Sequence, residues 1–142
     1  METLKYSLKN STFIHDIIKK IYNLKNKKKK NLIIWGNGRP KRVVLYVDDL
    51  ANACVYFLNK KTKNKLINIG SNIEFSITEY AKKIMKLLKV KAKIIYKKPK
   101  MNGVPRKKLN TKLAKKLGWV SQIGFNDGIL KTYDYYLKNE KK

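Results

Sequence analysis

Trp35, Arg39 and Arg42 are the side chains in this sequence whose types and spacing best suit the binding of a small charged ligand. The indole of Trp35 offers a flat surface on which a planar ring can stack, and each guanidinium presents a fork of N–H donors that matches phosphate oxygens. This combination indicates a ligand with a planar ring and a phosphate. An ordinary hairpin with a half-buried tryptophan would have the same spacing, and spacing alone favours that second interpretation.

Two predicted strands position these side chains. Residues 31–34 form a short apolar run of strand length, and residues 43–47 form a second run that is rich in β-branched side chains. A loop rich in glycine and proline separates the two runs, which predicts a strand, a turn and a strand. The next helix is predicted to begin at Asp48 and Asp49, whose carboxylates interact favourably with the positive end of a helix dipole.

The rest of the sequence alternates predicted helices with short strands. After Thr12, apolar residues recur at spacings of three and four, which predicts an amphipathic helix that ends near residue 26. Ser76 and Glu79 form a capping-box pattern at the start of another amphipathic helix. The remaining predicted elements are a short buried strand at 66–70, a strand at 92–96, a helix at 111–117 that ends at Gly118, and a final helix at 126–139.

Length and composition predict a cytoplasmic protein with one domain, or one domain with arms. The chain has 142 residues, and no apolar run approaches the roughly 20 residues of a membrane-spanning helix. The N-terminal segment also lacks the apolar core of a signal peptide. The only cysteine, Cys54, cannot form an internal disulfide. It lies with Leu50 and Leu58 on the predicted apolar face of a helix, so we expect a buried structural thiol.

The net charge of +26 raises nucleic-acid binding as an alternative function. The excess is almost entirely lysine, because Arg39, Arg42 and Arg106 are the only arginines. The lysines are spread over the whole sequence and occur among many Asn, Ile and Tyr residues, which is typical of a general drift in composition. We therefore expect only non-specific, salt-sensitive attraction to nucleic acids and other polyanions.

Several motifs in register resemble the GDP-L-fucose synthases of the extended short-chain dehydrogenase/reductase superfamily. The segment Trp-Gly-x-Gly-x-Pro-x-Arg, followed by a strand and Tyr-Val-Asp-Asp, is similar to the nucleotide-sugar-binding segment of that family. The similarity continues in the same order at residues 68–71, 76–79, 102–107 and 117–119. It implies an α/β fold, and within it the C-terminal substrate-binding portion of a Rossmann-type enzyme that lacks the N-terminal cofactor-binding half.

The resemblance divides the chain into three parts and implies a set of ligand-binding residues. Residues 1–30 correspond to a helix and basic loop of the substrate lobe, 31–70 to elements that complete the Rossmann sheet and the nucleotide site, and 71–142 to the C-terminal α/β substrate-binding lobe. The residues implied to bind a GDP-sugar are Lys20, Trp35, Arg42, Asn102 and Lys107.

Four positions depart from the family pattern, and each change weakens it. Thr12 stands where the family has its acid/base histidine, and a hydroxyl cannot replace imidazole in proton transfer near neutral pH. Lys20 replaces an arginine and loses the bidentate fork. Val43 replaces an acidic neighbour of the phosphate-contacting arginine, and Asn102 replaces an aspartate. His15 lies three residues after Thr12 and is expected to be a surface or capping residue.

The sequence also lacks the groups that the resembled family uses to bind and use NADP. It has no glycine-rich turn between a strand and a helix, and no Tyr-x-x-x-Lys pair on a predicted helix. The prediction is a GDP-sugar-binding portion of an epimerase/reductase, truncated or split, which binds no cofactor and is inactive alone. The alternative from another class is a non-catalytic fragment that docks on a Rossmann-domain partner or on itself, because the predicted strand at 66–69 would need a sheet edge.

Overall fold

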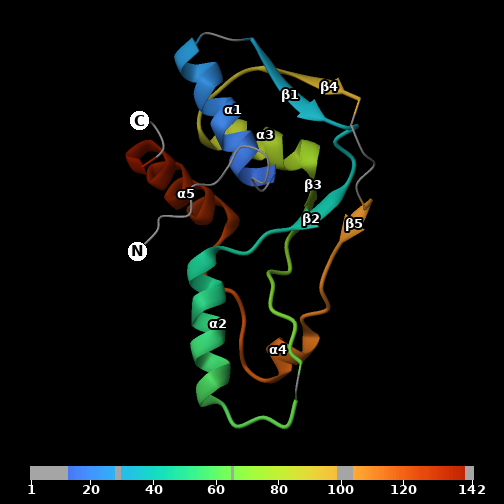
Figure 1. Cartoon of the computed structure of the whole chain (residues 1–142), viewed down its shortest axis with the longest axis vertical. Helices are drawn as coiled ribbons and strands as arrows, with labels where there is room; N and C mark the ends of the chain where they lie inside the picture. The colour runs from blue at the N-terminus through green and yellow to red at the C-terminus, as the bar shows by residue number, and fades with distance from the viewer. Residues whose placement is uncertain (1–12, 28–29, 65, 99–103, 140–142) are drawn as a thin grey trace. The chain divides into compact units, whose positions relative to one another are not determined.

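The computed structural model describes residues 13–27, 30–64, 66–98 and 104–139, which separate into two compact units. The first unit consists of the described residues of Met1–Arg39 and Ser76–Gly103, and the second of those of Pro40–Phe75 and Val104–Lys142. Each unit is therefore built from two separate stretches of the sequence (Figure 1).

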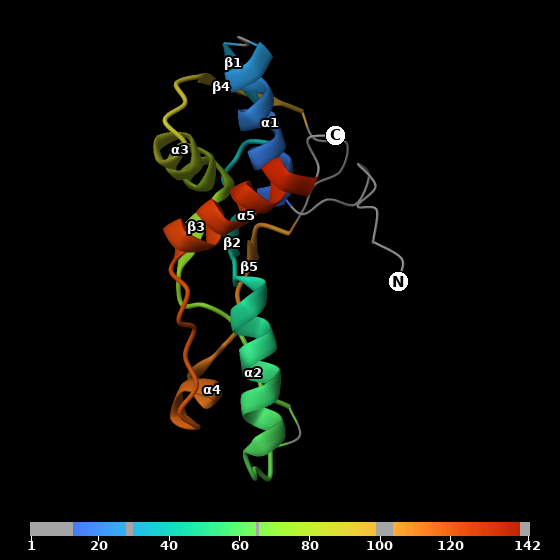
Figure 2. The same ribbon diagram turned by 90° about the vertical axis from the view of Figure 1, so that its left-hand side faces the viewer.

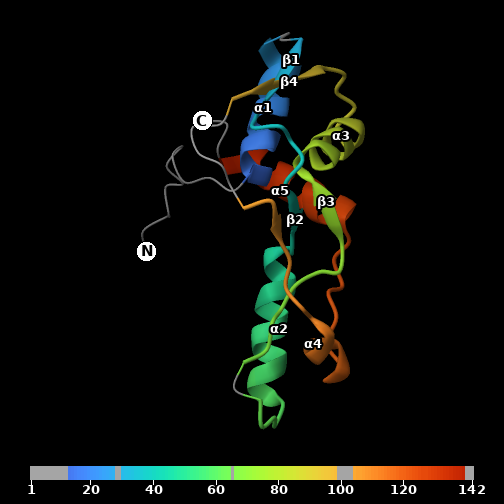
Figure 3. The ribbon, with the colours of Figure 1, turned by 90° about the vertical axis from the view of Figure 1, so that its right-hand side faces the viewer.

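The first unit is a parallel strand pair with two helices. The strands are β1 (Asn31–Trp35) and β4 (Lys93–Lys97), which pair in parallel from Asn31↔Lys93 to Trp35↔Lys97. The helices are α1 (Phe13–Lys27) and α3 (Ile77–Leu87). Both lie on the same side of the strand pair (Figures 1 and 3), and β1 accordingly buries Leu32 and Ile34 while Trp35 at its end is exposed. The predicted helices and strands of this unit are confirmed, with bounds shifted by about one residue.

The core of the first unit contains the five largest fully buried side chains among the described residues. They are Ile18 and Ile21 of α1, Leu32 of β1, and Tyr80 and Ile84 of α3. The start of α3 is stabilised locally, because the Ser76 hydroxyl accepts a hydrogen bond from the Glu79 backbone N–H while the Glu79 carboxylate accepts one from the Ser76 N–H. This confirms the predicted capping box.

The second unit combines a small three-stranded sheet with three helices. The strands are β2 (Lys41–Val43), β3 (Glu74–Ser76) and β5 (Arg106–Lys107), in the order β3-β2-β5, and β3 ends at the boundary of the unit. The helices are α2 (Val47–Asn59), α4 (Lys112–Lys116) and α5 (Phe125–Asn139). The helices that begin near Asp48, Lys112 and Asn126 are confirmed, whereas the predicted strand at 43–47 ends at Val43 and α2 already begins at Val47.

The second unit has a small apolar cluster that is surrounded by specific hydrogen bonds. Ala53, Ala114 and Trp119 form the cluster. The Trp119 indole N–H donates to the Asn52 side chain over 3.0 Å. The buried Asp49 carboxylate accepts the backbone N–H groups of residues 122 and 123, each over 3.0 Å, so it fixes the segment before α5 to the start of α2. Its role is structural, as expected for an aspartate at the start of a helix.

Gly118 ends α4 in the way the sequence predicts. Its φ is +94°, and the backbone N–H groups of Gly118 and Trp119 donate to the carbonyls of Lys115 and Ala114. This pattern is a Schellman motif, in which a left-handed glycine closes the helix. A Cβ atom here would also lie 2.7 Å from the Tyr56 hydroxyl oxygen, which leaves no room for a side chain.

Two predictions about the second unit are wrong, and both concern burial. Residues 66–70 form no strand ladder in the part of the chain that the structure describes, and Leu66 is 78% exposed. A strand requires a neighbour for its backbone groups, and the small sheet of this unit does not extend to this segment. Cys54 is exposed rather than buried, and so are Leu50 and Leu58, because α2 turns Ala53, Tyr56 and Phe57 towards the cluster instead.

Candidate functional site

In the first unit, the candidate ring-stacking residue lies at the C-terminal end of the parallel strands. Trp35 ends β1, is 55% exposed and pairs in register with Lys97, the last residue of β4. The backbone N–H of Gly36 donates to the Lys97 carbonyl over 2.7 Å, which continues the pairing into the loop. Ligands of open α/β sheets bind at the C-terminal ends of the strands. Lys97 is a cation at this end that the sequence did not single out.

Gly38 fixes the loop that follows Trp35. Its carbonyl accepts the backbone N–H of Thr78 at the start of α3 over 3.0 Å, and its φ is +68°. A Cβ atom at this position would lie 2.0 Å from the Thr78 hydroxyl oxygen and 2.7 Å from the Tyr96 ring. These two side chains are themselves hydrogen-bonded over 2.9 Å. Glycine is therefore required for the loop to approach α3 and β4 this closely.

Lys20 lies on α1 and is engaged within its own helix. Its ammonium group donates to the Asp16 carboxylate one turn earlier, over 2.5 Å, and its side chain is only 26% exposed. A phosphate group at Lys20 would have to compete with this carboxylate. The structure thus shows a local ion pair for a residue that the sequence predicted to bind substrate.

In the second unit, two predicted phosphate-binding residues are neighbours across a pair of parallel strands. Arg42 of β2 is the register partner of Lys107 of β5, although 65 positions separate them in the sequence. Arg42 is partly buried and donates from Nη1 to the Lys41 carbonyl over 2.7 Å, whereas Lys107 is exposed. The structure therefore places two cations side by side on one small sheet.

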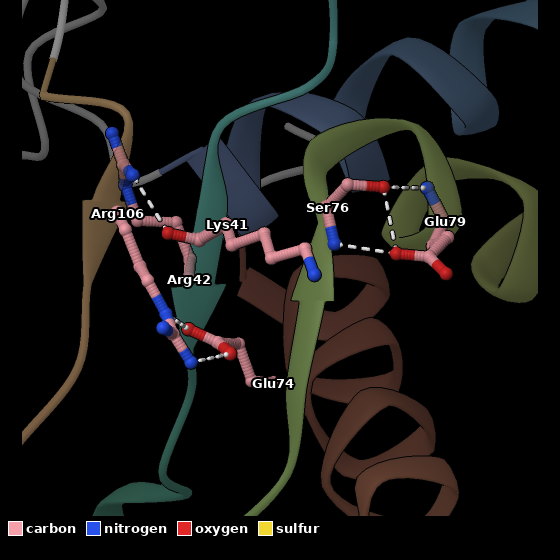
Figure 4. Close-up of polar contacts among 6 residues, drawn as sticks. All are labelled: Lys41, Arg42, Glu74, Ser76, Glu79 and Arg106. Carbon is pink, nitrogen blue, oxygen red and sulfur yellow. Dashed lines mark hydrogen bonds and ion pairs between the residues drawn. The ribbon is translucent and has the colours of Figure 1, made fainter.

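Arg106, next to Lys107, makes a bidentate ion pair with Glu74. Its Nε and Nη2 atoms each donate to a Glu74 carboxylate oxygen over 2.8 Å. Because Arg106 belongs to β5 and Glu74 to β3, and β2 lies between them, the pair spans β2 (Figure 4). Hydrogen bonding from Arg106 holds the pKa of Glu74 below its ordinary value. Burial opposes this shift, and the nearby positive charges of Arg106, Lys108 and Lys41 lower the pKa further.

The described residues contain no candidate metal site. No group of three or more His, Cys, Asp and Glu side chains among them could hold a metal ion. Thr12 and Asn102, the positions predicted to replace a catalytic histidine and a substrate-contacting aspartate, lie outside the described residues. None of the helices that the structure describes has the length and apolar character needed to cross a membrane.

Comparisons with known proteins agree on one family. The model of the NAD dependent epimerase/dehydratase family matches residues 3–70. GDP-L-fucose synthase 1 of Arabidopsis thaliana is 34% identical over 130 residues, and GDP-L-colitose synthase of Yersinia pseudotuberculosis is 38% identical over 138 residues. These matches cover 92% and 96% of this chain but only 40% and 44% of the relatives, so the chain spans about two fifths of their length.

Solved structures confirm the fold. A GDP-L-fucose synthetase from Naegleria fowleri superposes with a TM-score of 0.82 over 96% of this chain and 42% of its own, at 19% identity. The chain therefore has an α/β fold that aligns with part of an extended short-chain dehydrogenase/reductase structure.

Proposed function

Because this chain is a partial-length homologue of the GDP-L-fucose synthases, in the NAD dependent epimerase/dehydratase family, we propose that it is the GDP-sugar-binding, C-terminal portion of such an epimerase/reductase. Its motifs follow the order of that portion, and the sequence lacks the glycine-rich turn and the Tyr-x-x-x-Lys pair of the cofactor-binding half. On this proposal the chain binds the substrate and catalyses nothing alone.

The observation that carries the proposal is the pairing of Arg42 with Lys107. A guanidinium fork beside an ammonium group suits a diphosphate, because the fork binds two oxygens at once and the ammonium adds a compact charge. Arg106 contributes only indirectly to this proposed site, because its Nε and Nη2 donors are already hydrogen-bonded to Glu74. The ion pair holds β5 beside β2 and so keeps Lys107 in register with Arg42.

In the first unit, Trp35 is a separate candidate, which the family resemblance implies as a stacking surface for the base. Its indole is more than half exposed at the end of β1, and the loop behind it is held by Gly38. Lys97 lies opposite Trp35 in the register and supplies a cation at the same strand ends. Lys20 and Asn102 remain proposed contacts of the sugar nucleotide, with Lys20 exchanging Asp16 for a ligand oxygen.

NADP does not fit the described residues. Homologues of known structure bind NADP, among them the Naegleria fowleri synthetase. A dinucleotide needs a helix N-terminus that is free of negative charge, because its pyrophosphate is anionic. Every described helix longer than one turn and a half has a carboxylate in its first turn, namely Asp16, Asp48 with Asp49, Glu79 and Asp127. We therefore derive no reduction step for this chain.

Calorimetric titration of GDP into the purified chain tests the proposal, with ATP as the comparator. We expect saturable binding that prefers GDP and is about tenfold or more weaker in Arg42→Ala, since a charge-assisted hydrogen bond contributes about 1.5 to 3 kcal/mol. Trp35→Ala should weaken GDP binding as well. Lys61→Ala, which removes an exposed cation with no proposed role, is the control.

Equal binding of GDP and ATP that neither variant changes would contradict the proposal. If that binding also disappeared between about 50 and 200 mM salt, the charge of the chain alone would account for it.

A further inference from the structure

The strand pair of the first unit has a face that is turned away from α1 and α3, which we call its outer face. Leu32 and Ile34 of β1 are buried on the helix side, so the alternation of a strand directs Trp35 to the outer face. Seen from opposite directions, α1 lies in front of β1 in Figure 2 and behind it in Figure 3. The indole of Trp35 therefore projects from the side of the strands that carries neither helix of this unit.

Lys97 lies beside Trp35 on the outer face. The two residues are register partners in parallel strands, whose side chains point to the same side of a sheet and whose backbones lie about 4.8 Å apart. Trp35 is 55% exposed, and Lys97 is exposed as well. Among the residues that the structure describes, no carboxylate pairs with Lys97. Its ammonium group is therefore available to a ligand that stacks on the indole.

The backbone around this pair is held in place, and the loop that follows leaves room for a ligand. The Gly36 N–H donates to the Lys97 carbonyl over 2.7 Å. The hydroxyl of Tyr96, on the opposite face, is hydrogen-bonded to that of Thr78 over 2.9 Å. Apart from the two chain neighbours, no atom of the described residues lies within 4 Å of the position that a Cβ atom of Gly36 would take. A planar base beside Trp35 thus has space next to strands whose relative position is set.

A lysine beside a stacked purine favours guanine over adenine. The ammonium group of lysine has three N–H donors and no acceptor. The edge of guanine that carries O6 and N7 presents two acceptors, whereas adenine has a donor amino group in place of O6. Lysine can therefore donate to both groups of guanine, but in adenine it meets one acceptor and one like donor.

We propose that Lys97 sets the base preference of this chain, by donating from Nζ to O6 and N7 of a guanine that stacks on Trp35. The inference deepens the proposed function and rests on it for the class of ligand, a guanosine diphosphate sugar. Different residues carry it, because the proposed phosphate contacts Arg42 and Lys107 belong to the second unit. Loss of a base contact weakens binding of guanine nucleotides alone, whereas loss of a phosphate contact weakens binding of every nucleoside diphosphate.

Calorimetric titration of GDP, IDP and ADP into the full chain tests this role. The base of IDP keeps O6 and N7 and lacks only the 2-amino group of guanine. Lys97→Met, which replaces the ammonium group by an uncharged chain of similar length, should weaken GDP and IDP binding about tenfold and leave ADP binding unchanged. Lys97→Arg should retain the preference for GDP over ADP, because a guanidinium also donates to O6 and N7.

Lys93→Met is the matched control for charge. Lys93 is an exposed residue at the other end of β4, on the same face and about 13 Å from Lys97 along the strand. Its substitution removes the same charge and should leave all three affinities unchanged. The effect of Lys97→Met should also disappear in a Trp35→Ala background, since Lys97 can donate to the base only where the indole holds it.

Two results for Lys97→Met would overturn this role. An equal loss for GDP and ADP would make Lys97 a phosphate contact, and no loss for any nucleotide would show that another group reads the base. In either case, weaker GDP binding in Arg42→Ala would still support the proposed function. Absence of saturable GDP binding to the unchanged chain would refute both proposals, so the two failures are distinguishable.

Discussion

The first unit buries the largest apolar side chains, whereas the second leaves many of its own exposed to solvent. All five of the largest fully buried side chains belong to the first unit. Of the thirteen large apolar side chains that are exposed among the described residues, eleven belong to the second unit, and only Trp35 and Tyr96 to the first. The second unit depends more on specific polar contacts, such as those of Asp49 and Arg106.

This difference indicates which unit has a closed apolar core and which unit leaves apolar surface exposed. A helix–strand layer with a closed core stabilises itself, because apolar burial is the dominant favourable term in folding. A unit with a small apolar cluster and exposed apolar side chains on α2 gains less from burial.

Truncation of one buried side chain in each unit should show the largest contrast. Ile84→Ala, in the core of the first unit, should lower the free energy of unfolding by about 2 to 5 kcal/mol, because it leaves a cavity. Leu58→Ala on the exposed side of α2 should change it by no more than about 0.5 kcal/mol. Urea unfolding followed by circular dichroism measures both free energies. Similar losses for the two variants would contradict the proposed difference in burial between the two units.

Loss of the Asp49 carboxylate should have a smaller effect that is confined to the second unit. Asp49→Ala leaves two backbone N–H groups without their acceptor, and we expect a loss of about 1 to 3 kcal/mol. Trp119 fluorescence in a Trp35→Phe background reports on this unit alone. The control, Asp48→Ala, removes an exposed carboxylate 3.9 Å from Lys131 and should be nearly neutral. A large effect of the control would show that charge, rather than hydrogen bonding, holds the start of α2.

The Glu74–Arg106 pair should have the smallest effect and a definite pH dependence. The pKa of Glu74 is lower in the folded chain than in the unfolded chain, so the unfolded chain binds more protons in the acid range. The stabilisation is therefore complete above the ordinary carboxyl pKa and is lost as the pH falls through the lowered value. Melting temperatures from neutral to acid pH should fall by more in the unchanged chain and in Asp134→Asn than in Glu74→Gln. An identical pH profile for Glu74→Gln would show that the pair contributes nothing.

Local patterns in the sequence were sufficient to predict most elements. The apolar spacing of α1, the capping box of α3 and the glycine that ends α4 each depend on residues within a few positions of one another. The order of short motifs was likewise enough to identify the family, which the matching relatives confirm. Trp35 and Arg42 could be chosen as candidate ligand-binding residues for the same reason, because residue type and neighbouring motif carry the inference.

Contacts between distant segments were decided only by the tertiary structure. The sequence could not show that Glu74 occupies the fork of Arg106, 32 positions away, or that Arg42 lies beside Lys107. It also predicted burial for Cys54 and a strand at 66–70, because an apolar stripe and a β-branched run state what a segment can cover or pair with and not whether a neighbour is present. Periodicity is a local property of the chain, whereas burial and strand pairing require a second surface that only the folded arrangement supplies.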